Sequence, residues 1–222
     1  MIYMILCGGK YDKWQKPRQL KPLMGEPLVA RTIRLLKEAG VDEEDITISA
    51  DDPDFEAFGV PVLNHFNRYQ VTEGGVVGDW VNAFITPGCP ICYIFGDVVF
   101  SPEAIKTIVE TPTADFEFFA SAPPFAENYK KPWAEPFAIK VVDFLKFEAA
   151  IQETKELTEK GYFRRPPIMW ELWQVLKGTP LNIIDYTNFC IINDYTCDID
   201  GPEDAAFFEE VIHEIINNNS GI

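Results

Sequence analysis

The chain has 222 residues, of which 47% are hydrophobic, and its formal net charge is −16. This length supports one sizeable hydrophobic core, and we expect a single domain. The negative charge would repel polyanions, and no apolar run approaches the roughly 18 residues of a membrane span, so we expect a cytoplasmic protein with no nucleic-acid and no membrane partner.

The chain opens with an apolar run, residues 2–6, that leads into Gly8-Gly9. Such a run before glycines is typical of a buried strand in a parallel sheet. Five of the 19 basic residues follow between Lys10 and Lys21. Glycines let a ligand approach the backbone closely, and ammonium and guanidinium groups bind phosphate. The loop therefore predicts a compact phosphate site, with a solvated basic turn as the alternative.

Helix and strand patterns alternate along the chain and predict an α/β protein. Apolar residues recur at helical spacing from Leu28 to Ala39, with Pro27 at the first helical position and Gly40 as the stop. We expect further strands at 46–50, 60–63, 92–95, 116–120, 136–142, 182–184 and 188–192. We expect further helices at 76–84, 104–109, 144–160, 169–176 and 203–216.

A carboxylate follows one of these expected strands. Asp97 comes directly after the apolar run 92–95 and Gly96. Its side chain is therefore expected at the carboxyl end of a buried strand, where open α/β sheets bind their ligands.

Five cysteines are present, two of them with C-x-x-C spacing at Cys89 and Cys92. A second pair and a nearby histidine are both missing, so a redox or metal pair is the less favoured interpretation. Cys7 and Cys190 lie in apolar strand-like runs, where a small buried thiol is the ordinary interpretation.

The basic loop resembles the signature of nucleotidyltransferases that join a nucleoside triphosphate to a sugar phosphate or a related alcohol phosphate. That signature is approximately L-A-G-G-x-G-x-R, then P-K-Q-L, then G-x-P-[LM]-[IV]. The matching segments here are Leu6-Cys7-Gly8-Gly9, Pro17-Arg18-Gln19-Leu20 and Gly25-Glu26-Pro27-Leu28-Val29. Lys13 stands where the family usually has Arg, and Arg18 stands where it usually has Lys. Both departures keep the positive charge, although the two side chains bind phosphate differently.

The resemblance implies roles for the residues of this loop. Leu6, Gly8, Gly9 and Lys10 would bind the nucleotide. Lys13 and Arg18 would be the catalytic cations on the polyphosphate, where charge builds on the leaving pyrophosphate.

Two further stretches resemble metal-binding motifs of the same family. The segment from Tyr93 to Phe100 is similar to its strand-ending G-D-x-x-F, and the segment from Asp198 to Asp204 is similar to D-x-D-T-P-E-D, with Gly in place of Thr. The resemblance implies that Asp97 and Asp200 hold Mg²⁺, with Asp198 as the reserve ligand. The alternative for Asp200 is a cap on the helix that Pro202 begins.

Weaker assignments follow from position alone. Gly74 and Gly75 occupy the place where relatives pass backbone against the nucleobase, although a turn before a helix has the same composition. Glu135 and Lys140 lie where relatives bind the acceptor. Arg164 and Arg165 could meet an acceptor phosphate or be solvated, and Trp170 and Trp173 are expected in the core.

Together these features predict a Rossmann-like three-layer α/β/α fold with a mainly parallel mixed central sheet, of the nucleotide-diphospho-sugar transferase and glycosyltransferase-A-like type. Residues 1–120 would form the nucleotide-binding half, and residues 121–222 the acceptor-binding half with a closing helix. The expected activity is magnesium-dependent transfer of a nucleotidyl group to a sugar-phosphate-like acceptor, with release of pyrophosphate. A molybdopterin guanylyltransferase, a glycosyltransferase and a non-catalytic nucleotide-sugar-binding relative are the alternatives, and a homo-oligomer is left open.

Overall fold

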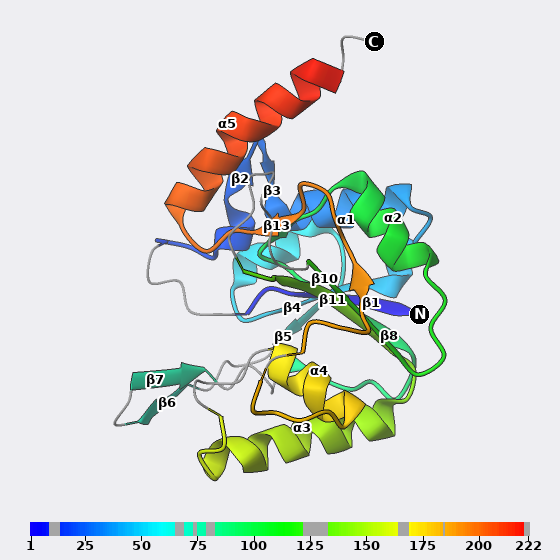
Figure 1. Ribbon diagram of the computed structural model, residues 1–222. Coiled ribbons are helices and arrows are strands. Elements are labelled where there is room, and N and C mark those ends of the chain that lie inside the picture. The colour runs from blue at the N-terminus through cyan, green and yellow to red at the C-terminus, as the bar shows by residue number, and fades with distance from the viewer. Residues whose placement is uncertain are drawn as a thin grey trace.

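The computed structural model describes residues 1–8, 14–64, 69–72, 75–78, 83–121, 133–163, 169–183 and 185–219, with backbone alone at 69–72, 75–78 and 211–219. Its centre is a seven-stranded sheet in the order β12-β10-β11-β8-β1-β4-β5 (Figure 1). The strands are β1 (Ile2–Leu6), β4 (Ile46–Ala50), β5 (Val62–Asn64), β8 (Ile91–Phe95), β10 (Phe116–Ala120), β11 (Pro136–Val141) and β12 (Cys190–Ile191).

Every pairing in this sheet is parallel except the two that β11 makes with β8 and β10. The expected mainly parallel mixed sheet is therefore confirmed. Since the parallel strands run the same way, their carboxyl ends lie at one edge of the sheet, together with the first residues of β11.

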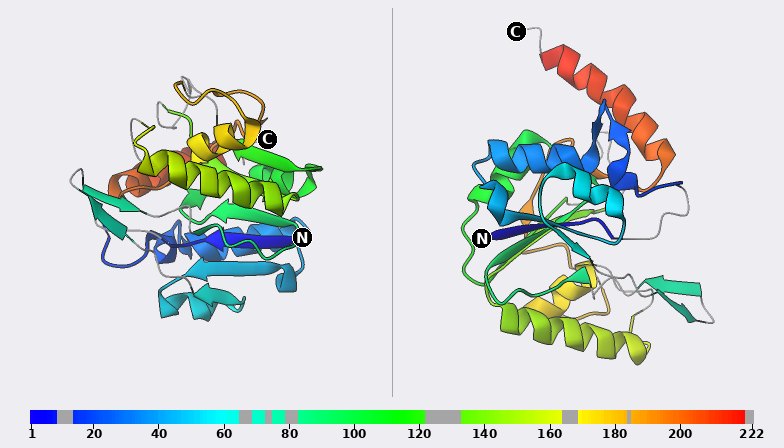
Figure 2. Two further views of the ribbon diagram at one scale, coloured as in Figure 1. Left: turned by 90° about the horizontal axis from the view of Figure 1, so that it is seen from below. Right: turned by 180° about the vertical axis from the view of Figure 1, so that it is seen from behind.

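Two helices cover each face of the sheet, which confirms the three layers (Figures 1 and 2). The helices α1 (Leu28–Glu38) and α2 (Pro102–Glu110) lie on one side, and α3 (Phe144–Glu159) and α4 (Met169–Lys177) on the other. Successive side chains of a strand point to opposite faces. Accordingly, Tyr3 and Ile5 of β1 belong to the core beneath α1 and α2, whereas Met4 and Leu6 belong to the core beneath α3 and α4.

The expected core role of two tryptophans is confirmed. Trp170 is 1% exposed and Trp173 is 6% exposed. Both rings contact Phe118 of β10, with ring centroids 5.0 and 5.4 Å apart, and the Trp170 indole donates a hydrogen bond to Ala134 O at 3.3 Å. These side chains fix α4 against the sheet.

A third, smaller core lies beneath the last helix, α5 (Pro202–Asn219), which extends beyond the body of the molecule (Figure 1). Phe208 of α5 packs there with Leu23, Leu28 and Ile199. Four short strands frame this region, paired as β2 (Pro22–Leu23) with β3 (Glu26–Pro27) and β9 (Val98–Val99) with β13 (Cys197–Asp198). Among the described residues no helix is long and apolar enough to cross a membrane.

Four expected elements differ in the structure. The helix expected at 76–84 is wrong over residues 76–78, which belong to β7 (Gly75–Gly78) and pair antiparallel with β6 (Tyr69–Thr72), in keeping with the β-branched pair Val76-Val77. Residues 79–82 of that expected helix lie outside the described part of the chain. Residues 182 and 183 form a bend, not a strand, and only two residues of the strand expected at 188–192 pair with β10. The helix α1 begins at Leu28, so Pro27 precedes the helix.

Candidate functional site

The predicted nucleotide loop and the predicted metal carboxylate begin at neighbouring strand ends. β1 and β8 are paired in parallel, with Leu6 opposite Phe95. Gly8 follows β1, and Asp97 follows β8, so both lie at the carboxyl edge of the sheet. The Cys7 amide also donates to Ser49 O at 2.8 Å, which ties the start of the loop to β4.

Gly96 lets these two strand ends approach closely. Its amide donates a hydrogen bond to Leu6 O at 3.0 Å. A Cβ at this position would lie 2.7 Å from both Leu6 O and Cys7 Sγ and 3.3 Å from Gln19 Cγ. Only glycine fits at such a distance without a shift of backbone, so Gly96 determines where Asp97 stands relative to the loop.

A short antiparallel pairing brings the second carboxylate motif to the first. β9 follows Asp97, and Asp198 of β13 lies opposite Val98. The amide of Ile199 donates to Asp97 O at 2.8 Å, which extends this contact. Backbone bonds therefore hold Asp97 and the segment from Asp198 to Asp200 together, although a hundred residues of sequence separate them.

The guanidinium of Arg18 lies between the two predicted metal carboxylates. Its Nη2 donates to Asp97 Oδ2 in a short contact, and its Nη1 donates to Asp200 Oδ1 at 3.1 Å. The side chains of Arg18 and Asp97 are only 20% and 24% exposed, whereas Asp200 is 51% exposed. Three motifs that the sequence places far apart thus meet through one side chain.

The burial of these charges changes their acidity. Burial raises the pKa of Asp97, and the neighbouring Asp198 and Asp200 raise it further, against the opposite effect of Arg18. For Arg18, burial lowers the pKa, but Asp97, Asp200 and Asp198 outweigh it, so the net shift is upward. Arg18 therefore keeps its charge, whereas burial disfavours the charged form of Asp97.

The helix that follows Asp200 carries another acid in its first turn. α5 begins at Pro202, and Asp204 in its first turn accepts hydrogen bonds from the amides of Asp200 and Gly201 at 2.9 and 3.0 Å. An acid three residues into a helix commonly binds back to the first amides in this way. The Asp200 carboxylate accepts a hydrogen bond from Arg18.

A groove of about 380 Å³ opens beside Arg18, between the basic segment and α5. It is lined by Trp14, Arg18, Lys21, Pro22, Leu23, Leu28, Ile199, Pro202, Ala205, Ala206 and Glu209. The Trp14 indole donates to Asp200 O at 3.3 Å, which attaches the basic segment to the carboxylate motif. Sequence reasoning gave Trp14 no role, and its position within the basic loop was the only signal.

Glu135 also lies at this edge of the sheet. It directly precedes β11, is 2% exposed, and accepts a hydrogen bond from the Asp198 amide through Oε2 at 3.1 Å. Its backbone is bonded to Ser121, which follows β10. Glu135 therefore lies next to the carboxylate motif, in a place consistent with its predicted role near the acceptor.

Lys140 lies elsewhere. It is opposite Cys92, near the amino end of β8, and its Nζ donates to Val109 O and Thr111 O at 3.0 and 2.7 Å. These carbonyls belong to the end of α2 and the residue after it. Lys140 therefore binds the free carbonyls at the end of a helix, as basic side chains commonly do. It lies at the opposite end of the strand from Asp97, and we propose no acceptor role for it.

Several predicted residues lie outside the described part of the chain. These are Gly9, Lys10, Lys13, Gly74, Arg164 and Arg165. Gly75 is described, and it opens strand β7 opposite Thr72.

Asp97 and Asp200 are of the residue type that could hold a magnesium ion. Asp97 and Asp200 offer the hard oxygen ligands that Mg²⁺ prefers, and they converge on a common point, the Arg18 guanidinium. Within the described ranges, no three acidic, cysteine or histidine side chains gather into a complete metal site. Proteins usually hold Mg²⁺ beside phosphates with only one or two carboxylates, so this donor set suits a metal that arrives with a triphosphate.

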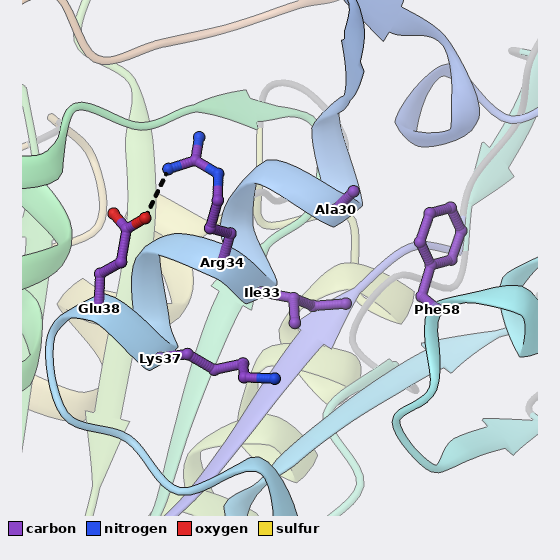
Figure 3. Close-up of a pocket in the computed structure, with 6 residues that line it drawn as sticks. All are labelled: Ala30, Ile33, Arg34, Lys37, Glu38 and Phe58. Atoms are coloured by element: carbon purple, nitrogen blue, oxygen red, sulfur yellow. Dashed lines mark hydrogen bonds and ion pairs between the residues drawn. The ribbon is translucent and has the colours of Figure 1, made fainter.

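A second groove lies between α1 and the short helical turn Pro53–Phe58 (Figure 3). It is lined by Ala30, Ile33, Arg34, Lys37, Glu38 and Phe58. Its cations are already paired, Arg34 with Glu26 and Glu38, and Lys37 with Glu43. A phosphate would have to compete with these carboxylates, so this groove is the weaker candidate for an anion site.

No known family model matches the chain, and no curated protein sequence matches it. Solved structures do match over nearly the whole length. An inositol-1-phosphate CTP transferase from T. maritima has a TM-score of 0.57 at 12% identity, over 94% of this chain and 95% of that one. A putative glucose-1-phosphate thymidylyltransferase from Bacillus anthracis has a TM-score of 0.58 at 13% identity, over 95% and 94%.

A CTP:phosphocholine cytidylyltransferase from Streptococcus pneumoniae is similar as well, with a TM-score of 0.52 at 15% identity, over 95% of this chain and 98% of that one. Identities this low establish a common architecture and leave the activity to the site itself. The chain therefore has the Rossmann-like three-layer fold of these nucleotidyltransferases.

Proposed function

We propose that the protein is a magnesium-dependent nucleotidyltransferase that joins a nucleoside triphosphate to a sugar phosphate or a related alcohol phosphate. One observation carries the proposal: Arg18, Asp97 and Asp200 meet at the carboxyl edge of the sheet. These residues belong to three separate segments that resemble motifs of the same family. The fold supports the proposal, because it is shared with transferases that are named for CTP or thymidylyl transfer to phosphate compounds.

In the proposed reaction, an oxygen of the acceptor phosphate attacks the α-phosphorus of the triphosphate. The bond between the α-phosphorus and the oxygen that bridges to the β-phosphate breaks, and pyrophosphate leaves with that bonding pair. The attacking oxygen is already ionised, so no proton must be removed from it. The reaction therefore requires in-line positioning and neutralisation of charge, with no nucleophilic serine or histidine.

The side chains at the site would divide these tasks. Arg18 would bind phosphate oxygens through its planar fork of donors, with Lys13 and Lys10 of the preceding loop. The backbone at Gly8 and Gly9 would allow the triphosphate to approach the loop closely. Asp97 and Asp200 would hold Mg²⁺, which when bound neutralises charge on the triphosphate.

The acceptor would lie on the side of Glu135. Its carboxyl group is buried at the start of β11 and is bonded to the Asp198 amide, so it can orient the segment that carries Asp200. The neighbours of similar fold are named for inositol 1-phosphate, glucose 1-phosphate and phosphocholine, three monoesters of phosphate. We propose a phosphate monoester of this kind as the acceptor class.

Pyrophosphate release from a panel of triphosphates and phosphate monoesters tests the proposal. We expect release that requires Mg²⁺ for at least one pairing and that falls about 100-fold or more in Asp97→Asn. Asp185→Asn is the matched control, because that carboxylate pairs with Lys177 and lies outside the carboxylate cluster. Release that survives in Asp97→Asn would contradict the metal assignment. Tight binding of a nucleotide sugar without release under any pairing would favour a non-catalytic relative.

A further inference from the structure

The contact of Arg18 with two carboxylates at once has a chemical consequence for metal binding. The two terminal nitrogens of the guanidinium bind different partners, Nη2 the Oδ2 of Asp97 and Nη1 the Oδ1 of Asp200. The main chain of each aspartate is also held by a bond that does not involve Arg18. The backbone beside Asp97 is bonded to Ile199, and the backbone of Asp200 is bonded to Asp204.

The guanidinium and a divalent cation bound by the same carboxylates would compete for them. Mg²⁺ binds carboxylate oxygens at about 2.0–2.1 Å and demands nearly octahedral geometry. Arg18 already occupies one oxygen of each carboxylate, and its positive charge repels a second cation. A metal held by both aspartates must therefore share them with Arg18 or displace it from at least one.

Arg18 is also incompletely satisfied where it lies. Its Nε is buried and has no hydrogen-bond partner among the described residues. The groove beside it, lined by Trp14, Lys21 and Glu209 among others, gives the side chain open space on one flank. Phosphate oxygens match the fork of a guanidinium better than two separate carboxylates do, because one phosphate can accept two parallel bonds.

We propose that Arg18 competes with the divalent cation for Asp97 and Asp200 and releases them when a triphosphate accepts its guanidinium. Metal binding is then conditional on the triphosphate, and by reciprocity the metal strengthens triphosphate binding by the same factor. Arg18 would thus act as a positioning residue that sets the order of assembly, in addition to its contact with phosphate. This inference rests on the proposed function of the same site.

Binding of Mn²⁺ alone, followed by electron paramagnetic resonance of the free ion, tests the competition without nucleotide or turnover. We expect Arg18→Ala to bind Mn²⁺ about tenfold tighter than the wild type, because it removes the cation that competes for both carboxylates. Lys16→Ala is the matched control. It removes one positive charge from the same segment, but Lys16 pairs with Asp54, so its Mn²⁺ affinity should stay at the wild-type value.

The double variant Arg18→Ala/Asp200→Asn identifies the ligands. If Asp97 and Asp200 hold the ion, the double variant should not show the increased Mn²⁺ affinity of Arg18→Ala. Arg18→Gln, which keeps a polar side chain of similar length without the charge, should show the same direction of change as Arg18→Ala and guards against a folding defect. Circular dichroism confirms that each variant is folded.

The inference is overturned if the folded Arg18 variants bind Mn²⁺ no tighter than the wild type, or if the double variant keeps the gain. The outcome is independent of the proposed reaction. If the protein releases no pyrophosphate but the Arg18 variants bind Mn²⁺ more tightly, the competition is supported and the proposed reaction is not. If the enzyme is active but the variants bind Mn²⁺ no more tightly, only the competition is refuted.

Discussion

Gly96 and Leu6 are bonded at a distance that leaves no room for a side chain. The Gly96 amide donates to Leu6 O at 3.0 Å, and a Cβ on Gly96 would lie 2.7 Å from the same oxygen. This contact joins the end of β8 to the end of β1. The spacing between the predicted phosphate loop and Asp97 therefore depends on a residue that has no side chain.

Gly96→Ala should lower the free energy of unfolding by about 1–3 kcal/mol, because backbone must move to admit the methyl group. Gly201→Ala is the matched control. The atoms nearest to its added Cβ are the carboxyl end of the flexible Glu203 side chain and not backbone, so a smaller loss than that of Gly96→Ala is expected. Urea denaturation of both variants measures the difference. If Gly96→Ala lowers the free energy of unfolding no more than Gly201→Ala does, the ends of β1 and β8 can move apart to admit the methyl group.

Asp97→Asn should make the fold more stable relative to the wild type above about pH 4, while it lowers the activity. The pKa of Asp97 is raised by burial above its usual 3.8, so the folded protein binds this proton more tightly than the unfolded chain does. The stability that the protonated group contributes is complete below about pH 4 and is lost as the pH rises through the folded-state pKa. An asparagine at position 97 does not titrate, so the variant does not lose stability through this group as the pH rises.

The melting temperature of Asp97→Asn, measured against the wild type in buffer with EDTA, should therefore rise relative to the wild type from about pH 4 upward. Added Mg²⁺ with triphosphate should stabilise the wild type by mass action, and should stabilise the variant less because one metal ligand is missing. A difference in melting temperature that shrinks with pH would show that Arg18 compensates fully for the buried charge.

The sequence predicted the fold better than the site. Strands 2–6, 46–50 and 116–120 have the predicted bounds, because continuous apolar runs bounded by polar or turn residues have few other interpretations. The hairpin at β6 and β7 was missed, since glycines around two valines suit a turn before a helix as well as a strand.

The site depends on contacts that no local pattern encodes. The pairing of β9 with β13 places Asp200 near Asp97, and two-residue strands give almost no periodicity to detect. The burial of Gln19, which is 1% exposed with Oε1 lacking a partner among the described residues, likewise had no local signal beyond its place in the motif. Lys140 was placed by its position along the sequence, whereas its antiparallel strand carries it to the opposite end of the sheet.

Cys92 provides a test of the core at alkaline pH. Burial raises the pKa of its thiol from 9.0 to about 12, although the nearby Lys140 lowers it. The stability that this neutral thiol contributes is present below pH 9.0 and is lost as the pH rises toward 12. The free energy of unfolding should decrease above pH 9, by up to about 1.4 kcal/mol per pH unit for this group.

The free energy of unfolding of Cys92→Ala should decrease less steeply above pH 9 than that of the wild type. The difference in slope should be that of one titrating group. Alkylation gives an independent check at pH 8. Cys92 is 0% exposed and should react with iodoacetamide only after denaturation, whereas the partly exposed Cys89 should react in the folded protein. Modification of both cysteines at similar rates would contradict the burial of β8.

Lys140→Met should destabilise the fold and leave the substrate site intact. The ammonium group donates to two carbonyls at the end of α2, and methionine keeps the apolar stem while it removes both bonds. Each lost bond should lower the free energy of unfolding by about 0.5–1.5 kcal/mol, partly offset because burial disfavours the charge and lowers the pKa of Lys140.

Triphosphate binding measured by calorimetry distinguishes this structural role from the acceptor role first expected of Lys140. We expect the dissociation constant of Lys140→Met to match that of the wild type, whereas Arg18→Ala should bind triphosphate at least about tenfold more weakly. The Michaelis constant for the acceptor should likewise be unchanged in Lys140→Met once a pairing that releases pyrophosphate has been found. A selective rise in that constant, with stability preserved, would return Lys140 to the acceptor site and would require β11 to present it at the edge where Asp97 lies.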